Sequence, residues 1–348
     1  ITAGRYRAGS RMNQLSAHID RAWDRMSAGD AEGALRSAEK AAELDRDSPE
    51  VQNLLGYVHA ASGHAEKAIE HYKQAIELDE SFVEAMLNAS EVLLHPLHDW
   101  DGAISMVDSA LEWIEDETEL ADALLLKVDA FLGKGDKAGA EAVLKRIPKK
   151  LPDNPGIDTA LGRAWYELGN AAVAEPLLER AIKGEPLMAD AHYYLGLCRE
   201  SRKDMAGMAV AFLHARDAEL KQGFAPSTLS QEDFEAIIRD AMQSVPEEFG
   251  PIIDGAFVIV SDVPGAEVVA EGVDPRIPVL LDGLSVEGEP HKASRIFVYR
   301  RNIERMGMPS KDDIARAITE EIRHLFFGAV PLVDERPTAE LFGHMENL

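Results

Sequence analysis

A residue pattern that recurs every 34 positions constrains the fold of this chain more than any other feature. Gly29 and Gly63 each precede a segment rich in Ala and Glu, and the same spacing separates Gly135 from Gly169. Lys203 holds the next equivalent place. A repeat of this length indicates helical hairpins that stack side by side, because one such unit cannot bury its own apolar face.

Small residues recur at fixed places within each unit. One set marks a position in the first helix, and a run of alanines opens the second helix. The first set is Ala22, Gly56, Ser90, Gly162 and Gly196, and the second is Ala34, Ala68, Ala103, Ala140 and Ala174. Small residues at a crossing let two helix backbones approach, while large apolar residues fill the space beside them. We expect six units, at about 15–48, 49–82, 83–120, 121–154, 155–188 and 189–220.

This spacing and residue set resemble the tetratricopeptide repeat family. The resemblance implies a mainly α chain that forms an α-solenoid and holds a partner protein or peptide in a concave groove. The groove would be lined by the first helix of each unit. By position, its partner-binding residues would be Asn53, Tyr57, Leu87, Glu91, Thr159, Arg163, Tyr166, Tyr193 and Leu197.

The charge balance narrows the class of partner. The sequence contains 36 Lys and Arg against 62 Asp and Glu, for a formal net charge of −26. A field of this sign repels phosphate backbones and anionic lipid headgroups, so we expect neither a nucleic acid nor a membrane as partner. It favours a basic peptide or protein face, bound more weakly as salt rises.

The single cysteine and the first residues bear on the compartment. Cys198 alone cannot form an intrachain disulfide, which fits the cytoplasm. No run of about 18 apolar residues predicts a membrane span. Residues 1–11 lack the apolar core of a signal peptide, and Gly9-Ser10 before Met12 is typical of a cloning remnant. We therefore expect the repeat array to span residues 12–222.

A change of pattern after the sixth unit predicts a second domain. Residues 223–230 are rich in Gly, Pro, Ser and Thr and read as a linker, and residues 231–348 as a small α+β domain. Apolar runs at 256–260 and 295–299 predict two strands, and residues 263–290 read as loops. A long helix is expected at 310–327, with Ser310 as its N-cap.

The order of these elements resembles the minimal zincin-like metallopeptidases of bacteria, over about residues 230–330. Those enzymes carry H-E-x-x-H on the final helix, where two histidines bind zinc and the glutamate is the general base. The corresponding stretch here is Glu320-Glu321-Ile322-Arg323-His324. The resemblance implies Glu321 as the base and His324 as the second histidine. Glu320 replaces the first histidine, and Asp334 is the first acid available as a third ligand.

These replacements leave three readings of the second domain open. Arg323 inside the motif opposes a cation, and Glu320 can form an ion pair with Arg316, Arg323 or His324 on an exposed face. We therefore expect a protein-interaction scaffold with a degenerate, inactive zincin-like domain and no cofactor. The alternative is a zinc-dependent metallopeptidase whose substrates the array recruits. In the third reading, the domain caps the apolar end of the solenoid.

Overall fold

The structure is a computed structural model of the chain, and it describes residues 2–148, 151–224, 229–284, 291–305 and 310–327. The chain divides into two compact units, Ile1–Pro152 and Asp153–His344. The division falls inside the expected array, between its fourth and fifth repeats. The last two repeats therefore share one compact unit with the α+β region. We call the two parts the N-terminal unit and the C-terminal unit.

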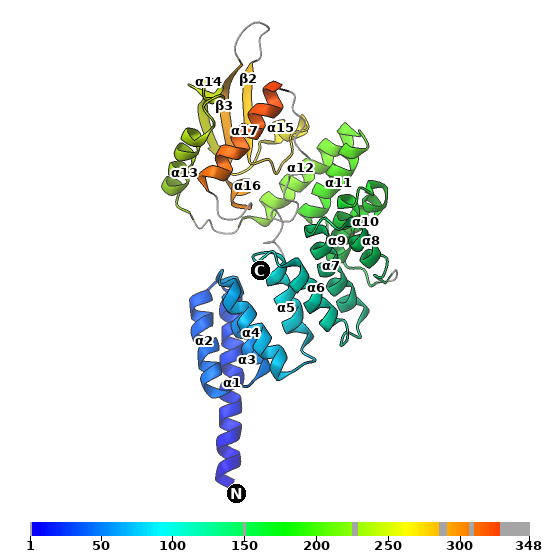
Figure 1. Cartoon of the computed structure of the whole chain (residues 1–348), viewed down its shortest axis with the longest axis vertical. Helices are drawn as coiled ribbons and strands as arrows, with labels where there is room; N and C mark the ends of the chain where they lie inside the picture. Colours follow the sequence, from blue (N-terminus) through cyan, green and yellow to red (C-terminus); the bar gives the residue numbers. More distant parts are fainter. Residues whose placement is uncertain (1, 149–150, 225–228, 285–290, 306–309, 328–348) are drawn as a thin grey trace. The chain divides into compact units, whose positions relative to one another are not determined.

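The N-terminal unit consists of helices that pack in successive antiparallel pairs (Figure 1). Its described residues form four such pairs, which match the first four predicted repeats. They are α1 (Thr2–Ser27), α2 (Ala31–Leu44), α3 (Pro49–Ala61), α4 (Ala65–Leu78), α5 (Val83–Leu94), α6 (Trp100–Ala110), α7 (Glu117–Gly133) and α8 (Lys137–Leu144).

The C-terminal unit begins with two further pairs and continues into a small sheet covered by helices (Figure 1). The pairs are α9 (Pro155–Glu167) with α10 (Ala171–Gly184), and α11 (Ala189–Ser201) with α12 (Met205–Gln222). The remaining elements are α13 (Gln231–Ser244), α14 (Gly250–Ile253), β1 (Phe257–Ser261), α15 (Ala266–Ala270), β2 (Val279–Leu284), β3 (Lys292–Tyr299), α16 (Arg300–Arg305) and α17 (Lys311–Phe327).

The small residues lie where the two helices of a pair cross. A Cβ added at Gly56 would come within 2.6 Å of the Tyr72 ring, and one at Gly196 within 2.3 Å of the Phe212 ring. Only glycine permits this approach, and each large residue is fully buried against it. The prediction that glycines let the helix backbones approach is confirmed at these crossings.

The 34-residue marker also has a structural cause. Gly29, Gly63, Gly135 and Gly169 adopt φ between 74° and 81°, the left-handed conformation that ends the first helix of a pair. Lys203 adopts φ 64° at the equivalent place, although its side chain disfavours that conformation. The sequence pattern therefore marks a backbone turn.

The sheet has the strand order β1-β3-β2, with β1 parallel and β2 antiparallel to β3. Residues 263–290 were expected to be loops, and this is wrong for β2 and for α15. Val279 and Leu281 of β2 point into the core beside Ile296 and Val298 of β3. The alternation was hidden because it covers six residues bounded by prolines and a glycine-rich segment.

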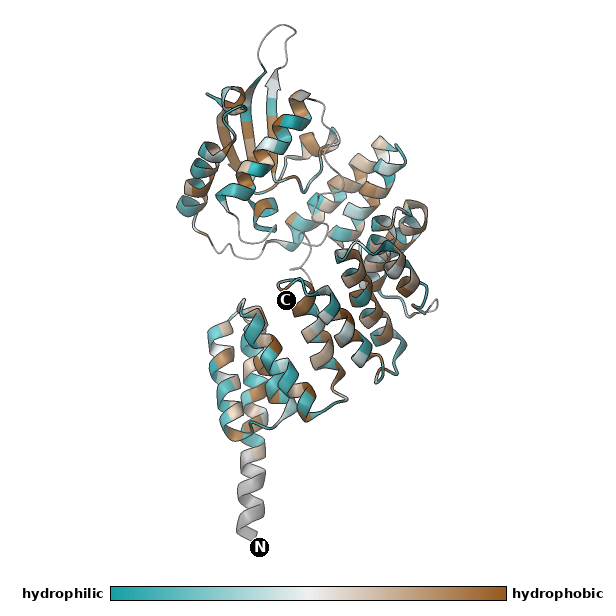
Figure 2. Cartoon of the chain, in the orientation of Figure 1, coloured by the Kyte–Doolittle hydropathy of each residue, from teal (hydrophilic) through white to brown (hydrophobic). Residues whose placement is uncertain are grey.

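Apolar residues of α13 and α17 complete this core. Ile314, Ile318, Ile322 and Phe326 of α17 share it with Phe234 and Ile238 of α13. Ser310 caps α17 as predicted, because its Oγ accepts a hydrogen bond from the Asp313 backbone N–H at 3.1 Å. Figure 2 shows the apolar strands beneath these helices. The edge strand β1 stays open, with Phe257 75% exposed.

Candidate partner-binding face and arginine site

In the N-terminal unit, the predicted partner-binding residues lie on α3 and α5. Asn53 is buried, donates from Nδ2 to Glu84 Oε1 at 3.0 Å, and accepts from Asn88 Nδ2 at 3.1 Å. Tyr57 is half-buried and its ring centroid lies 4.8 Å from that of Trp23. Amide and carboxylate side chains thus bridge successive first helices. One repeat further on, Leu87 is half-buried and Glu91 is exposed.

In the C-terminal unit, the predicted residues lie on α9 and α11. Thr159 is buried, and its hydroxyl donates to the Pro155 carbonyl at 2.8 Å. Arg163 and Tyr166 are half-buried, whereas Tyr193 and Leu197 are 6% and 7% exposed. The structure therefore divides the nine residues by access. Tyr57, Leu87, Arg163 and Tyr166 are partly exposed and Glu91 is exposed, while Asn53, Thr159, Tyr193 and Leu197 are buried.

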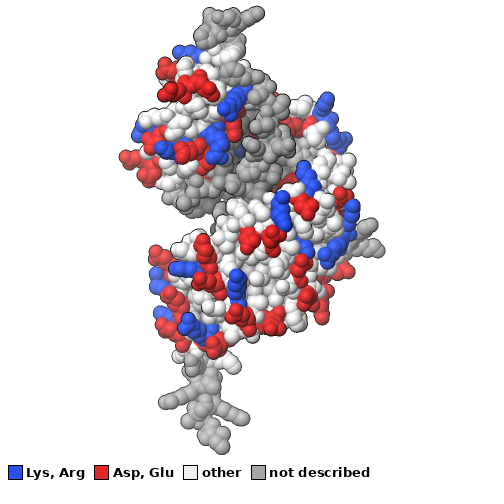
Figure 3. Space-filling view, in the orientation of Figure 1, with Lys and Arg blue, Asp and Glu red and all other residues white. Residues whose placement is uncertain are grey.

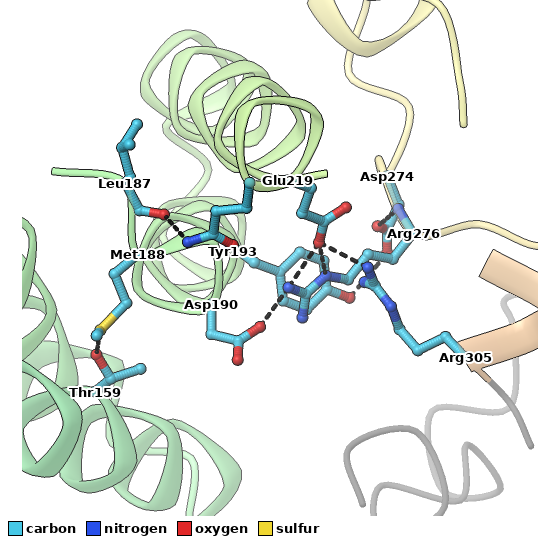
Figure 4. A network of polar contacts seen from close by, with 10 residues as sticks. Thr159, Leu187, Met188, Asp190, Tyr193, Glu219, Asp274, Arg276 and Arg305 are labelled. Atoms are coloured by element: carbon cyan, nitrogen blue, oxygen red, sulfur yellow. Dashed lines mark hydrogen bonds and ion pairs between the residues drawn. The ribbon is translucent and has the colours of Figure 1, made fainter. Parts of the chain in front are cut away.

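Tyr193 is covered by a loop of the same chain. The guanidinium of Arg276, in the loop between α15 and β2, lies 4.2 Å from the centroid of the Tyr193 ring (Figure 4). The Tyr193 hydroxyl donates to Asp274 Oδ2 at 3.1 Å, and Asp274 Oδ1 accepts from the Arg276 backbone N–H at 2.7 Å. The loop is thus fixed to the face of α11 at both residues.

Two carboxylates of the repeats hold the same guanidinium. Arg276 donates to Glu219 Oε1 from Nε at 3.1 Å and from Nη2 at 2.9 Å, and Nη2 also donates to Asp190 Oδ1. The side chains of Arg276 and Glu219 are each 4% exposed. Hydrogen bonds between ionised groups are stronger than neutral ones, and burial weakens their screening. We call Asp190, Tyr193 and Glu219 the arginine site.

The electrostatics of the arginine site favour the charged state of its members. Burial raises the pKa of Asp190, but the charges of Arg276, Arg305 and Arg163 outweigh it and hold this pKa below its ordinary value. Burial lowers the pKa of Arg276, but the carboxylates of Asp190 and Glu219 hold it above its ordinary value. The ion pair therefore stays charged although it is buried.

A second guanidinium reaches the site from α16. Arg305 Nη2 lies 2.8 Å from Glu219 Oε1, so Glu219 is shared by two arginines. Asn302 of α16 fixes the loop from behind, because its Nδ2 donates to the carbonyls of Pro275 at 2.9 Å and Ile277 at 2.8 Å. The α+β region is thus joined to the last repeat by buried polar contacts.

Sequence reasoning found Tyr193 but missed the other members of this site. Asp190 precedes Tyr193 by three residues, so both lie on one face of a helix, which was an available signal. Glu219 stands in the last turn of the sixth repeat, in a helix longer than its counterparts. Arg276 lies in an irregular loop, where no pattern distinguishes it from other surface arginines.

Residues 320–324, which were compared above with H-E-x-x-H, lie on α17. The Glu321 side chain is 12% exposed, and burial raises its pKa against the opposing effects of His324 and the Leu281 backbone N–H. His324 Nδ1 lies 4.0 Å from Glu321 Oε2, and both His324 and Glu320 are exposed. Among the described residues, no three His, Cys, Asp or Glu side chains form a group that could hold a metal. Asp334 lies outside the described residues.

The arginines expected to pair with Glu320 have other contacts. Arg316 Nη2 lies 2.8 Å from Asp313 Oδ1, and the guanidinium of Arg323 lies 5.3 Å from the centroid of the Phe249 ring. Arg323 therefore packs against an aromatic side chain near the motif.

None of the helices in the described ranges is long and apolar enough to cross a membrane.

Comparison with known proteins identifies the repeats. A family model described as a tetratricopeptide repeat matches residues 19–95 and 159–218. A solved structure of PilF from Pseudomonas aeruginosa is similar, with 17% identity and a TM-score of 0.51, over 65% of this chain and 99% of that one. PilW, a type IV pilus biogenesis factor, has 20% identity and a TM-score of 0.51, over 60% of this chain and 94% of that one. No curated protein matches the sequence.

These likenesses to solved structures show a fold and carry no information on partners. Together with the family model, they show that the chain carries tetratricopeptide repeats. Proteins of this kind are generally protein-interaction scaffolds.

Proposed function

We propose that the chain is a scaffold that binds a partner protein or peptide along the first helices of its repeats. The observation that carries this proposal is a row of accessible side chains at one repeat position. Tyr57 and Glu91 stand at this position on α3 and α5 of the N-terminal unit, and neither is buried. Leu87 of α5 adds apolar surface beside the row. A partner that contacts several repeats at once would meet one such side chain per repeat.

The partner that this chain favours is basic. The net charge of −26 attracts cations over a range set by ionic strength, and Figure 3 shows acidic side chains on both units of the face in view. A segment combining apolar residues with Lys or Arg fits both the charge and the row of accessible side chains.

Affinity measurements with a selected peptide test this proposal. Peptides are selected from a displayed library on the whole chain, and the best one is titrated by calorimetry. We expect Tyr57→Ala combined with Glu91→Lys to weaken binding at least about tenfold, or about 1.4 kcal/mol. Glu66→Lys makes the same charge change at an exposed site on the second helix α4 and is the matched control. Equal effects of the two variants would contradict the proposal.

We also propose that the α+β region is a degenerate zincin-like domain that acts without a metal. The exposed Glu320 in place of a histidine and the aromatic contact of Arg323 support this. The partly buried Glu321, with its raised pKa beside His324, favours the alternative of a metallopeptidase. Elemental analysis distinguishes them. One zinc per chain, together with peptide hydrolysis abolished by Glu321→Gln, would establish the alternative.

A further inference from the structure

The loop that carries Arg276 occupies the repeat face as a bound peptide would. Residues 271–278, all of them described, include neither helix nor strand. The loop presents Asp274 and Arg276 to α11, and both contact Tyr193. Tyr193 stands at a position where a partner contact was predicted from the repeat alone. The last repeat therefore already holds a ligand, which the chain itself supplies.

The chemistry of the arginine site selects a guanidinium. A flat cation stacks on the ring of Tyr193, while its edge donates to carboxylates on α11 and α12. A lysine ammonium has no plane to stack and no fixed fork of donors, so it cannot make both sets of contacts. The three groups that select the ligand belong to the repeats, whereas Arg276 and Arg305, which share Glu219, come from the α+β region.

The site is also open enough to exchange its ligand. The Asp190 side chain is 37% exposed, although its partner Arg276 is 4% exposed. A guanidinium could approach past Asp190 once the loop withdraws. The hydrogen bonds to the loop's backbone come from the α+β region, among them those from Asn302 and from the Tyr299 N–H to the Pro278 carbonyl, and would move with it.

We propose that Asp190, Tyr193 and Glu219 form an arginine-recognition site of the repeat array, in which Arg276 is an internal ligand that an arginine-bearing segment of the partner replaces. This deepens the proposed function and rests on it for the identity of the partner as a basic segment. The internal ligand is tethered, so its effective concentration lies on the order of millimolar. An external arginine therefore binds weakly until the loop withdraws. Its apparent affinity is the intrinsic affinity multiplied by the fraction of chains in which the loop has withdrawn.

The test uses the whole chain with Arg276→Ala, which removes the internal guanidinium from Tyr193 and Asp190 while Arg305 still contacts Glu219. The probe is a labelled synthetic peptide of residues 271–278, Glu-Gly-Val-Asp-Pro-Arg-Ile-Pro. We expect it to bind the variant at least tenfold more tightly than the wild-type chain, measured by fluorescence anisotropy. The same peptide with lysine in place of arginine should bind the variant at least tenfold more weakly. Adding Tyr193→Leu to the variant should abolish the preference for arginine.

Each outcome decides for or against the internal ligand. A folded Arg276→Ala chain that does not bind the peptide would overturn the inference, as would equal binding to the wild type. Circular dichroism establishes whether the variant is folded. If it is not, methylguanidinium is added. Recovery of the fold by methylguanidinium but not by methylammonium supports the site, and no recovery overturns it. If Tyr57→Ala with Glu91→Lys does not weaken binding of the library-selected peptide, that result contradicts the proposed function alone.

Discussion

The two units share the packing of the repeat at their helix crossings and differ in what the faces of their first helices contact. At the helix crossings they are alike, because Gly56 meets Tyr72 in the N-terminal unit as Gly196 meets Phe212 in the C-terminal unit. On the faces of the first helices they differ. Asn53 of α3 bonds to side chains of the next first helix, whereas Tyr193 of α11 holds a loop from another region of the chain.

The length of the second helix explains part of this difference. Helix α4 has 14 residues and ends at an exposed Asp79, which is its C-cap. Helix α12 has 18 residues, so the equivalent residue, Glu219, lies inside the helix and is buried. One further turn thus converts a surface carboxylate into an anchor for two guanidiniums. A repeat sequence fixes the packing between its helices and leaves these faces free to diverge.

Glu219→Ala removes the carboxylate that distinguishes the C-terminal unit, and we expect it to cause the largest loss of stability. The substitution leaves Arg276 and Arg305 buried without their shared carboxylate. Removing one partner of a buried ion pair costs about 3–5 kcal/mol. We expect this loss in the unfolding free energy of the C-terminal unit, measured by urea denaturation. Hydrogen exchange should show faster opening in α11, α12 and α16, and unchanged rates in α3 and α4.

The matched control for this prediction is Glu185→Ala. Glu185 is exposed and stands one repeat before Glu219, as the C-cap of α10. A surface substitution of this kind changes stability by about 0.5 kcal/mol or less. Comparable losses in the two variants would show that the buried network adds no stability.

The helices were predictable because their signals are local and repeated. Turn residues and small helix-crossing residues fix the phase of each unit, and the units on either side of the longer third one repeat every 34 residues. The strand β2 was not recognised from the sequence because its six residues contain one alternating buried pair, Val279 and Leu281, which is too short a pattern to indicate a strand. A packing partner such as Ile296 becomes visible only when the sheet has formed.

The arginine site was only partly predictable for a related reason. Tyr193 is identified by repeat position, because every first helix presents the same face. Arg276 reaches the site through contacts with residues far away in the sequence, such as Asp190 and Glu219, and no local pattern predicts such contacts. Burial cannot be read from repeat position alone, because Asn53 and Thr159 stand at positions that the repeat predicts to face a partner and both are buried in the structure.

The turn at Lys203 offers a smaller change that sharpens the comparison. Lys203 and Gly63 are equivalent, with φ of 64° and 75°. A residue with a side chain costs about 1–2 kcal/mol in this left-handed conformation. Glycine avoids this cost, but it loses more conformational entropy on folding, which offsets part of the gain. We expect Lys203→Gly to stabilise the C-terminal unit by about 0.5–1 kcal/mol in urea denaturation.

The reciprocal change, Gly63→Lys, should destabilise the N-terminal unit by a similar amount. A Cβ at Gly63 meets no atom within 4 Å, so backbone strain is the expected cause. Stabilisation by both substitutions, or by neither, would contradict the assignment of this strain to the turn.

Mild acid should destabilise both units, with the smallest effect of the three, because burial also lowers the pKa of His192 beside His214 in the C-terminal unit. His59 and His71 of the N-terminal unit stack with ring centroids 5.3 Å apart. Burial is the main cause that lowers the pKa of each below 6.5, and the charge of His59 lowers that of His71 further. Lowered pKa values favour the neutral form of both rings at neutral pH, and His71 Nδ1 lies 2.9 Å from Gln52 Oε1.

A histidine whose pKa is lower in the folded than in the unfolded state contributes its full stabilisation at pH values above the pKa of the unfolded chain. That contribution is lost as the pH falls from about 6.5 through the folded pKa, because the unfolded chain binds protons first. We expect the N-terminal unit to lose stability between pH 7.5 and 5.5, and the double variant His59→Gln with His71→Gln to lose less. His98→Asn is the control, because His98 is exposed in a loop at φ 50°, which asparagine tolerates. Hydrogen exchange in α3 and α4 measures the effect, and an unchanged pH slope in the double variant would assign it to other groups.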